Sequence, residues 1–261
     1  MKIKTKKSLG QNFLIDKNIL KKISEIEIIN NNSEIIEIGP GSGNLTEILI
    51  KKKPKKMFVI EKDDELVKVL KDKFQSIKII NADILNFSDK KIFSSNSIIY
   101  GNLPYNISSQ ILVKFIINVQ KFKFKKLIFM FQKEMADRIL AKVNTKNYGR
   151  LSILSNWKFN IKKVIDIKSN SFSPKPKVDS SLLIFSKKES YNEFKNPKNL
   201  EKITKIFFNQ RRKKIKKPFN QLLGKNLKII KKLNLNLDFR PQNLNPETYY
   251  ALTNEYENLI K

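Results

Sequence analysis

The tetrapeptide Asn102-Leu103-Pro104-Tyr105 carries residue types that could act on the exocyclic amine of a base. The N6 lone pair of adenine is delocalised into the ring, so this nitrogen is a poor nucleophile. The side-chain oxygen of Asn102 and the backbone carbonyl of Leu103 could accept its two hydrogens and draw it toward tetrahedral geometry. Pro104 stiffens the turn, and Tyr105 offers a ring on which the base could stack. The alternative is an ordinary turn after a strand.

A second aromatic residue could close the other side of such a base. Phe172 lies in a segment stiffened by Pro174 and Pro176. Enzymes that act on an extruded base hold it between aromatic or apolar faces. Phe172 is therefore a candidate for the second face, and the alternative is a hydrophobic plug in the core.

A glycine-rich loop precedes this stretch and could hold a cofactor. Gly39, Gly41 and Gly43 alternate with other residues after the acidic Glu37, between an apolar run and a helix-like segment. A strand, a glycine-rich turn and a helix start together cradle nucleotide-like ligands. The spacing differs from the dinucleotide fingerprint and resembles motif I of S-adenosylmethionine (SAM)-dependent methyltransferases. A carboxylate at Glu37 also suits a cationic ligand, and a tight structural turn is the alternative.

Acidic residues follow the next two predicted strands. Glu61 ends the second strand, roughly 20 residues after the glycine loop, where an acidic side chain accepts ribose hydroxyls. Asp83 and the adjoining Ile84 follow the third strand and are candidates for contact with an adenine ring. A capping role is the alternative for these acidic residues, and it fits Asp63 and Asp64 better than Glu61.

Composition excludes several kinds of chemistry. The 261 residues contain no Cys and no His, so a disulfide, a thiolate metal site and a cysteine nucleophile are excluded, and we expect no metal. The net charge of +29 indicates a polyanionic partner such as nucleic acid, although compositional bias toward Lys explains part of it. Only five basic residues are Arg, and Arg211 and Arg212 are adjacent. Arg suits bidentate phosphate contacts, so this pair is the best local candidate.

The N-terminal region is basic but has no apolar signal core, and no apolar run approaches the ~20 residues of a membrane span. We therefore expect a cytoplasmic protein without membrane contact. Gln11 and Asn12 could belong to a lid over a ligand or to a simple lead into a helix capped by Asp16.

Strand and helix patterns alternate up to residue 187, which predicts a doubly wound, Rossmann-like α/β sheet over residues 1–187. The later residues, 188–261, read as a small α-helical domain that contacts RNA. Predicted strands cover 34–38, 57–60, 77–80, 97–100, 127–131, 158–167 and 181–186. A tight turn is expected at 148–152, and C-terminal helices at 200–208, 211–223, 225–234 and 246–260.

Taken together, these motifs resemble the rRNA adenine N6,N6-dimethyltransferases, the KsgA/RsmA (Dim1) family, over nearly the whole chain. The motifs are Leu9-Gly10-Gln11-Asn12-Phe13-Leu14, residues 37–43, Glu61, Ala82-Asp83, residues 101–107, Gln132-Lys133-Glu134, Tyr148-Gly149-Arg150-Leu151-Ser152, Phe172 with Pro174 and residues 176–180, and Asn209-Gln210-Arg211-Arg212-Lys213. The lysine- and asparagine-rich C-terminal tail departs from the pattern.

The resemblance implies two successive methylations from SAM on each of two adjacent adenosines near the 3′ end of 16S rRNA, in the small ribosomal subunit. We expect a monomer. The candidate cofactor contacts are Gln11, Asn12, Leu14, Glu37, Gly39, Gly41, Gly43, Glu61, Asp83, Ile84 and Asn102. The candidate catalytic residues are Asn102, Leu103, Pro104, Tyr105 and Phe172, and the candidate RNA contacts are Arg150, Arg211, Arg212 and Lys213.

Three other interpretations are weighed against this one. The erythromycin-resistance methyltransferases, which act on large-subunit rRNA, match less well at 148–152 and 209–213. A non-catalytic ribosome-assembly factor would not need intact Asn102, Tyr105, Glu61 and Asp83. A nucleotide-dependent oxidoreductase is disfavoured by the glycine spacing.

Overall fold

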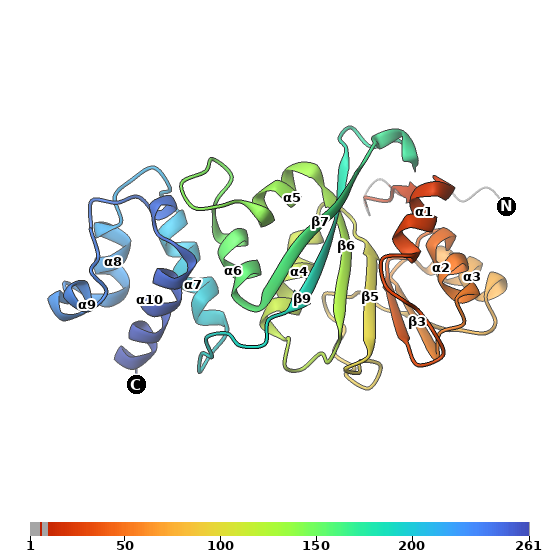
Figure 1. Ribbon diagram of the computed structural model, residues 1–261, viewed down its shortest axis with the longest axis horizontal. Helices are drawn as coiled ribbons and strands as arrows, with labels where there is room; N and C mark the ends of the chain where they lie inside the picture. Colours follow the sequence, from red (N-terminus) through yellow and green to blue (C-terminus); the bar gives the residue numbers. More distant parts are fainter. Residues whose placement is uncertain (1–5, 7–9, 261) are drawn as a thin grey trace. The chain divides into compact units, whose positions relative to one another are not determined.

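The computed structural model describes residue 6 and residues 10–260 (Figure 1). The described chain forms two compact units. Unit 1 consists of Met1–Ala136 and Ile161–Lys187, and unit 2 consists of Asp137–Asn160 and Lys188–Lys261. The sequence predicts one domain over residues 1–187, whereas in this division residues 137–160 group with the C-terminal helices.

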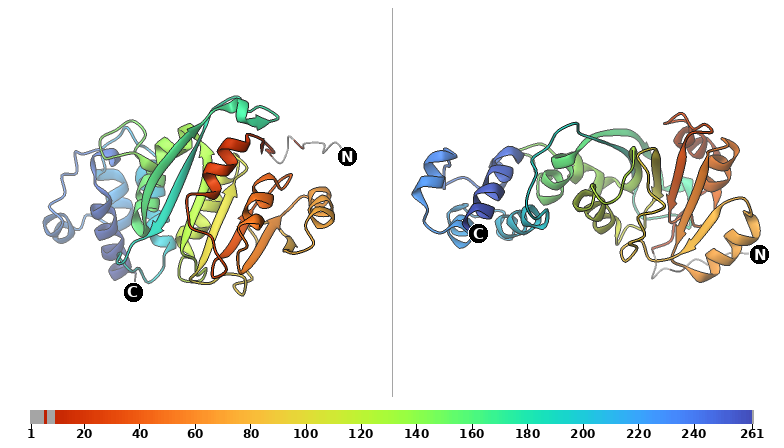
Figure 2. Two further views of the ribbon diagram at one scale, coloured as in Figure 1. Left: turned by 45° about the vertical axis from the view of Figure 1, so that its right-hand side comes forward. Right: turned by 90° about the horizontal axis from the view of Figure 1, so that it is seen from below.

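A seven-stranded sheet forms the centre of unit 1. Its strand order is β4-β3-β2-β5-β6-β9-β7. In the left view of Figure 2, the green and teal strands β7 and β9 run side by side at one edge of the sheet. The strands span Glu34–Ile38 (β2), Lys56–Glu61 (β3), Lys78–Asn81 (β4), Ser97–Asn102 (β5), Lys126–Gln132 (β6), Phe159–Ile167 (β7) and Ser180–Lys187 (β9).

The direction of the strands places several loops at one edge of the sheet. Strands β2, β3, β4, β5 and β6 are parallel, and β9 pairs antiparallel with β6. Ile38, the last residue of β2, is paired with Ile60 on one side and Gly101 on the other. The chain order reverses at β2, and ligands of open α/β sheets bind at such a switch point, beyond the carboxyl ends of the strands.

The strands have near-continuous apolar sequences because helices cover both faces of a parallel sheet. Ile35, Ile36 and Ile38 of β2 are all almost completely buried. The helices of unit 1 are α1 (Lys17–Ser24), α2 (Asn44–Lys51), α3 (Asp64–Lys73) and α4 (Ser108–Ile117), and α5 (Lys133–Leu140) continues into unit 2. The Asp16 side chain accepts backbone N–H groups of Asn18 and Ile19, as expected for the cap of α1.

A small second sheet joins two distant segments of unit 1. β1 (Phe13–Leu14) pairs antiparallel with β8 (Phe172–Ser173), which follows the 3₁₀ turn η2 (Ser169–Ser171). The sequence analysis predicts neither strand. Two-residue strands have no readable periodicity, and their pairing depends on the tertiary fold.

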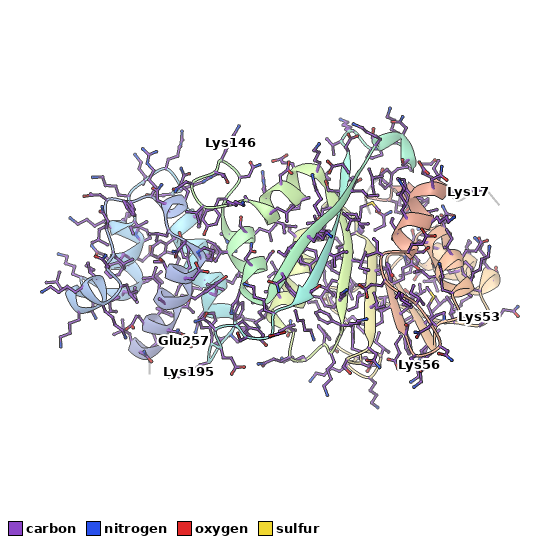
Figure 3. The ribbon with its side chains drawn as sticks, in the orientation of Figure 1. Lys17, Lys53, Lys56, Lys146, Lys195 and Glu257 are labelled. Carbon is purple, nitrogen blue, oxygen red and sulfur yellow. The ribbon has the colours of Figure 1, made fainter. Side chains whose placement is uncertain are left out.

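Unit 2 is mostly helical. Its elements are α6 (Arg150–Lys158), α7 (Lys198–Phe208), α8 (Lys216–Leu223), α9 (Leu227–Lys232), η3 (Pro241–Asn243) and α10 (Pro246–Leu259). The buried carboxylate of Glu257 on α10 accepts the N–H groups of Lys195 and Asn196 and the side-chain amide of Asn199. Figure 3 labels Glu257 and Lys195. No helix in the described residues is long and apolar enough to cross a membrane.

Two predicted elements of unit 2 are wrong. Residues 150–152 begin helix α6 instead of completing a turn, because the Ser152 hydroxyl accepts the Gly149 N–H and donates to the Arg138 carbonyl. The helix predicted at 211–223 begins only at Lys216. Pro218 then lies in the first turn, where its missing N–H needs no partner, and the preceding run of like charges forms a turn.

Candidate active site

A cavity of about 200 Å³ lies in unit 1 at the carboxyl ends of β2, β3 and β5. Eleven of the predicted site residues line it: Gln11, Asn12, Gly39, Gly41, Glu61, Asp83, Ile84, Asn102, Leu103, Pro104 and Tyr105. Four predicted residues of this unit, Leu14, Glu37, Gly43 and Phe172, do not line it. Other lining residues were not predicted as site residues, including Phe13, Lys62, Ala82, Asn106 and Ile107.

The glycine loop forms the cavity wall next to β2 and is in close contact with Phe13. Gly41 has a φ angle of +60°, and a β-carbon there would lie only 2.5 Å from Cδ1 of Phe13. Any side chain at this position would have to displace the ring. The loop and the N-terminal segment, residues 10–16, therefore form one continuous wall, in which Gly41 lies against the ring of Phe13.

Glu37 supports the glycine loop from below and does not face the main cavity. Its side chain is buried and accepts the Thr46 hydroxyl at 2.6 Å. Burial raises the pKa of Glu37 to about 7. The hydrogen bond from Thr46 lowers this pKa, and the nearby charge of Glu61 raises it. Glu37 lines a second, smaller cavity of about 20 Å³, together with Asn102.

Glu61 ends β3 and presents a fixed carboxylate to the cavity. One oxygen, Oε1, accepts the backbone N–H groups of Lys62 at 2.8 Å and Asp63 at 2.9 Å. Burial raises the pKa of Glu61, and N–H groups of Asp63, Lys62 and Gly41 oppose that rise. A carboxylate held by backbone donors is a suitable acceptor for a pair of hydroxyl groups.

Asp83 lies beside the cavity at the end of β4. Its carboxylate accepts the Lys62 ammonium at 2.8 Å and the N–H of Leu85 at 2.9 Å. The Lys62 hydrogen bond is the main reason that the pKa of Asp83 is lowered. Lys114 of α4 donates to the carbonyls of Leu85 and Phe87 and so fixes the same loop.

The Asn-Leu-Pro-Tyr turn follows β5 and completes the cavity. The Asn102 amide nitrogen donates to the backbone carbonyl of Asn12 at 2.9 Å. That bond fixes the amide plane and leaves the side-chain oxygen as the acceptor end. Leu103 is almost completely buried, and the half-buried Tyr105 shares a hydrogen bond of 2.7 Å with the hydroxyl of Ser180.

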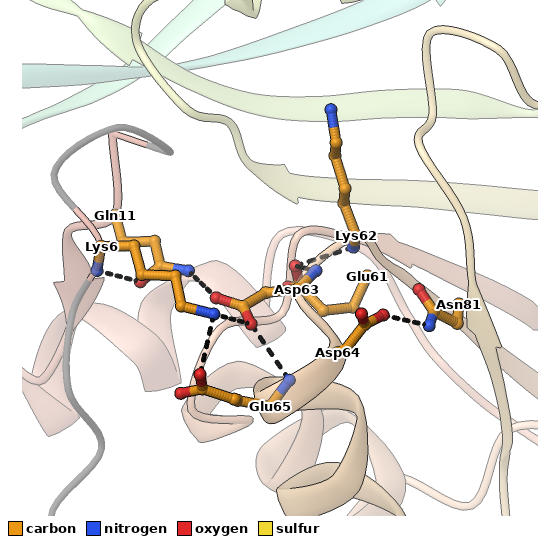
Figure 4. A network of polar contacts seen from close by, with 8 residues as sticks. All are labelled: Lys6, Gln11, Glu61, Lys62, Asp63, Asp64, Glu65 and Asn81. Carbon is orange, nitrogen blue, oxygen red and sulfur yellow. Dashed lines mark hydrogen bonds and ion pairs between the residues drawn. The ribbon is translucent and has the colours of Figure 1, made fainter.

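A polar network attaches the N-terminal segment to the start of α3 (Figure 4). The Asp63 carboxylate, only 4% exposed, accepts the Lys6 ammonium at 2.7 Å and the Gln11 amide at 2.8 Å. It also caps α3 by accepting the Glu65 N–H. Burial tends to raise the pKa of Asp63, but the hydrogen bonds from Lys6 and Gln11 outweigh it and leave the pKa lowered. Leu9, which belongs to the same sequence motif, lies outside the described residues.

Leu14 and Phe172 pack together in the hydrophobic core of unit 1. They are paired in the β1–β8 sheet, and both belong to a hydrophobic cluster with Leu20 and Leu182. Phe172 is 3% exposed. The ring of Phe172 therefore belongs to the core cluster, and it is not among the residues that line the cavity with Tyr105.

The predicted RNA contacts lie in unit 2. A guanidinium nitrogen of Arg211 donates to the carbonyl of Thr145 at 3.1 Å, and Arg150 lies 3.7 Å from Glu201. Arg212 and Lys213 are exposed. Among the described residues, the Nε atoms of Arg150 and Arg211 are buried without a hydrogen-bond partner.

The described residues contain no group of three or more acidic, His or Cys side chains that could hold a metal ion. The cavity instead combines two oriented carboxylates with apolar walls from Ile38, Ile60 and Ile84. These hydrogen-bond acceptors and apolar walls fit a ligand with an adenine ring and a ribose. The turn after β5 fits the amine that receives the methyl group.

The fold and this cavity define the class as a methyltransferase that takes its methyl group from SAM. The profile of the family described as "Ribosomal RNA adenine dimethylase" matches residues 2–258. The chain belongs to the ribosomal RNA adenine dimethylase family.

Similar proteins agree with this assignment. The chain is 57% identical over 261 residues to "Ribosomal RNA small subunit methyltransferase A" of Pelagibacter ubique, with 99% of each chain covered. It is 42% identical over 255 residues to the protein of that name from Mycoplasma mobile, covering 95% of this chain and 96% of the relative. A crystal structure of a dimethyladenosine transferase from Plasmodium falciparum is 28% identical, with a TM-score of 0.78 over 92% of this chain and 95% of that one.

Proposed function

We propose that this chain transfers methyl groups from SAM to N6 of two adjacent adenosines near the 3′ end of 16S rRNA, two to each, in the small ribosomal subunit. The observation that carries the proposal is that the Asn-Leu-Pro-Tyr turn lines the same cavity as Glu61 and Asp83. The proposed setting is the cytoplasm, with the protein acting as a monomer.

The cofactor-binding roles follow from the donors and acceptors around the cavity. Glu61 would accept the ribose hydroxyls, since its carboxylate is already oriented by two backbone N–H groups. Asp83 would accept the adenine amine, with Ile84 against the ring. When bound, SAM supplies an electrophilic methyl group on a sulfonium. The walls formed by Gly41 and Asn12 would hold the rest of the cofactor.

The chain's own contribution to methyl transfer is orientation of the acceptor amine. The side-chain oxygen of Asn102 and the backbone carbonyl of Leu103 would accept the two N6 hydrogens and direct the lone pair into the cavity. The bond from Asn102 to Asn12 holds the amide ready for this role. Tyr105 would stack on the base. Phe172 would form a second face only if its ring left the core cluster, so the proposal relies first on Tyr105.

Binding of the rRNA would involve the cationic residues of unit 2. Arg211, Arg212 and Lys213 form one run, and Lys146 belongs to the loop that Arg211 contacts through Thr145. Arg212 and Lys213 are exposed, so their charged groups are accessible to phosphates. Contacts of this kind would position the RNA without reading its sequence.

The test is to incubate the protein with labelled SAM and unmethylated small subunits and then to map the modified bases. Dimethyladenosine at two adjacent positions is expected. Tight binding of subunits without methyl incorporation would instead support a non-catalytic assembly factor. Asn102→Ala should abolish transfer and weaken SAM binding only in part. Asn118→Ala, which removes a half-buried amide at the end of α4, should leave turnover unchanged.

A further inference from the structure

One short hydrogen bond in unit 1 has no part in the proposed chemistry. The Tyr105 hydroxyl lies 2.7 Å from the hydroxyl oxygen of Ser180. Ser180 is 0% exposed and is the first residue of β9. Tyr105 belongs to the loop after β5, so this bond joins the proposed base-stacking ring to a different strand of the sheet.

Ser180 is held rigidly from both sides. It pairs with Gln132 at the end of β6. The preceding Asp179 is fixed by three bonds: its carbonyl accepts the Lys133 N–H, and its carboxylate accepts the Ser169 N–H and the Lys168 ammonium. The Ser180 hydroxyl is therefore a fixed point in the framework of the sheet.

The ring of Tyr105 depends on that fixed point. Its backbone lies in a loop, it is half-buried, and one side of it lines the cavity. The hydroxyl oxygen of a tyrosine lies on the axis about which its ring rotates, so a hydrogen bond there fixes the direction of that axis, which the first side-chain torsion sets. Without the bond, the axis of the ring could swing about the first side-chain torsion and move the ring along the cavity wall.

We propose that Ser180 is a positioning residue that sets where the Tyr105 ring lies at the cavity wall, and so controls how an adenine, and then its bulkier monomethylated form, is presented for methyl transfer. The inference rests on the proposed function. It assigns Ser180 no contact with substrate or cofactor. The second methylation should depend on it more, because a monomethylated amine has one hydrogen left to be fixed by acceptors and relies more on stacking.

The neighbouring residue provides a matched control. Ser181 is also 0% exposed and is also hydrogen-bonded, donating to Asp166 at 2.6 Å. Adjacent side chains of a strand point to opposite faces, so Ser181 cannot reach Tyr105. Ser180→Ala and Ser181→Ala each remove one buried hydroxyl from the start of β9.

The experiment compares Ser180→Ala, Ser181→Ala, Tyr105→Phe and the double variant Ser180→Ala/Tyr105→Phe. Single-turnover methylation of unmethylated small subunits is followed, and monomethyl- and dimethyladenosine are counted by mass spectrometry. Ser180→Ala and Tyr105→Phe should each slow transfer about 3- to 10-fold, the factor expected for one neutral hydrogen bond, and raise the monomethyl fraction. The double variant should be no slower than either single variant, and Ser181→Ala should match the wild type.

A spectroscopic measurement tests the ring itself without cofactor. In protein labelled with 3-fluorotyrosine, the fluorine resonance lost in Tyr105→Phe belongs to Tyr105. That resonance should shift or narrow in Ser180→Ala and stay unchanged in Ser181→Ala.

Three results would overturn the inference: an unchanged resonance in Ser180→Ala, equal kinetics for the two serine variants, or multiplicative losses in the double variant. Absence of methyl transfer by the wild-type protein would instead refute the proposed function, while the resonance would still report on the Ser180 bond. SAM affinity, measured by calorimetry, should be the same in all variants.

Discussion

Replacing Gly41 with Ala should weaken SAM binding strongly. The new β-carbon would lie 2.5 Å from Cδ1 and 2.7 Å from Cε1 of Phe13, and the backbone φ angle of +60° disfavours any L-residue. The left-handed conformation costs about 1 kcal/mol, and displacing a packed ring costs about 1–3 kcal/mol. Both costs together reduce the free energy of SAM binding, so the affinity for SAM should drop roughly 30-fold to several hundred-fold, at 1.4 kcal/mol for each factor of ten.

Gly224→Ala is a control for backbone strain away from Phe13. Gly224 has a φ angle of +66° and a ψ angle of −169°, a region that is essentially restricted to glycine, and an added β-carbon would meet no described atom within 4 Å. Gly224→Ala should therefore lower the melting temperature through strain alone and leave SAM affinity unchanged. Calorimetry of both variants, and of Gly41→Ala combined with Phe13→Ala, measures the difference. The reasoning fails if Gly41→Ala binds SAM within twofold of wild type, or if removing the Phe13 ring restores no affinity.

Three further predictions concern charged residues. Asp63→Asn should weaken SAM binding about 3- to 10-fold through loss of the Lys6 bond. Asp64→Asn should leave SAM binding unchanged, and equal SAM affinities of the two variants in calorimetry would refute this. Glu37 has its pKa raised to about 7, so the wild type should lose stability as pH rises from about 4.5 to 7. Glu37→Gln should remove that loss, with a gain of about 1–3 kcal/mol above pH 7 and little change at pH 5; an equal shift in melting temperature at pH 5 and 8 would contradict it. Replacing Arg211 and Arg212 with Gln should reduce the slope of log affinity for small subunits against log salt by about 1.4–1.8, while the same change at two exposed lysines of α3 should leave it unchanged.

The core of the sheet was predictable because its sequence signals are local. The apolar run at Glu34–Ile38 is bounded by polar residues and by the glycine loop, and the observed strand has those bounds. Glu61 and Asp83 were recognisable because parallel strands bring their carboxyl ends to one edge. Two-residue strands such as β1 and β8 give no such signal, since only the folded chain brings them together.

Roles that depend on distant partners were less predictable. The sequence suggested Asp63 as a helix cap, and it is one, but its bonds to Lys6 and Gln11 need the folded N-terminal segment. Glu37 follows the expected motif, yet its side chain turns beneath the loop toward Thr46. For Phe172, the sequence left a base-stacking face and a core plug equally open, and the structure places the ring in the core.

The pairing of β1 with β8 has a consequence for the order in which the site can be assembled during synthesis. Ile15 and Asp16 donate to the carbonyl of Ser171, and Leu14 pairs with Phe172. The segment that walls the cofactor cavity leaves the ribosome before its partner strand, which is made only after most of unit 1. A nascent chain ending before residue 171 would therefore lack the strand that anchors this wall. An enzyme proposed to finish small ribosomal subunits would gain a secured cofactor site only late in its own translation.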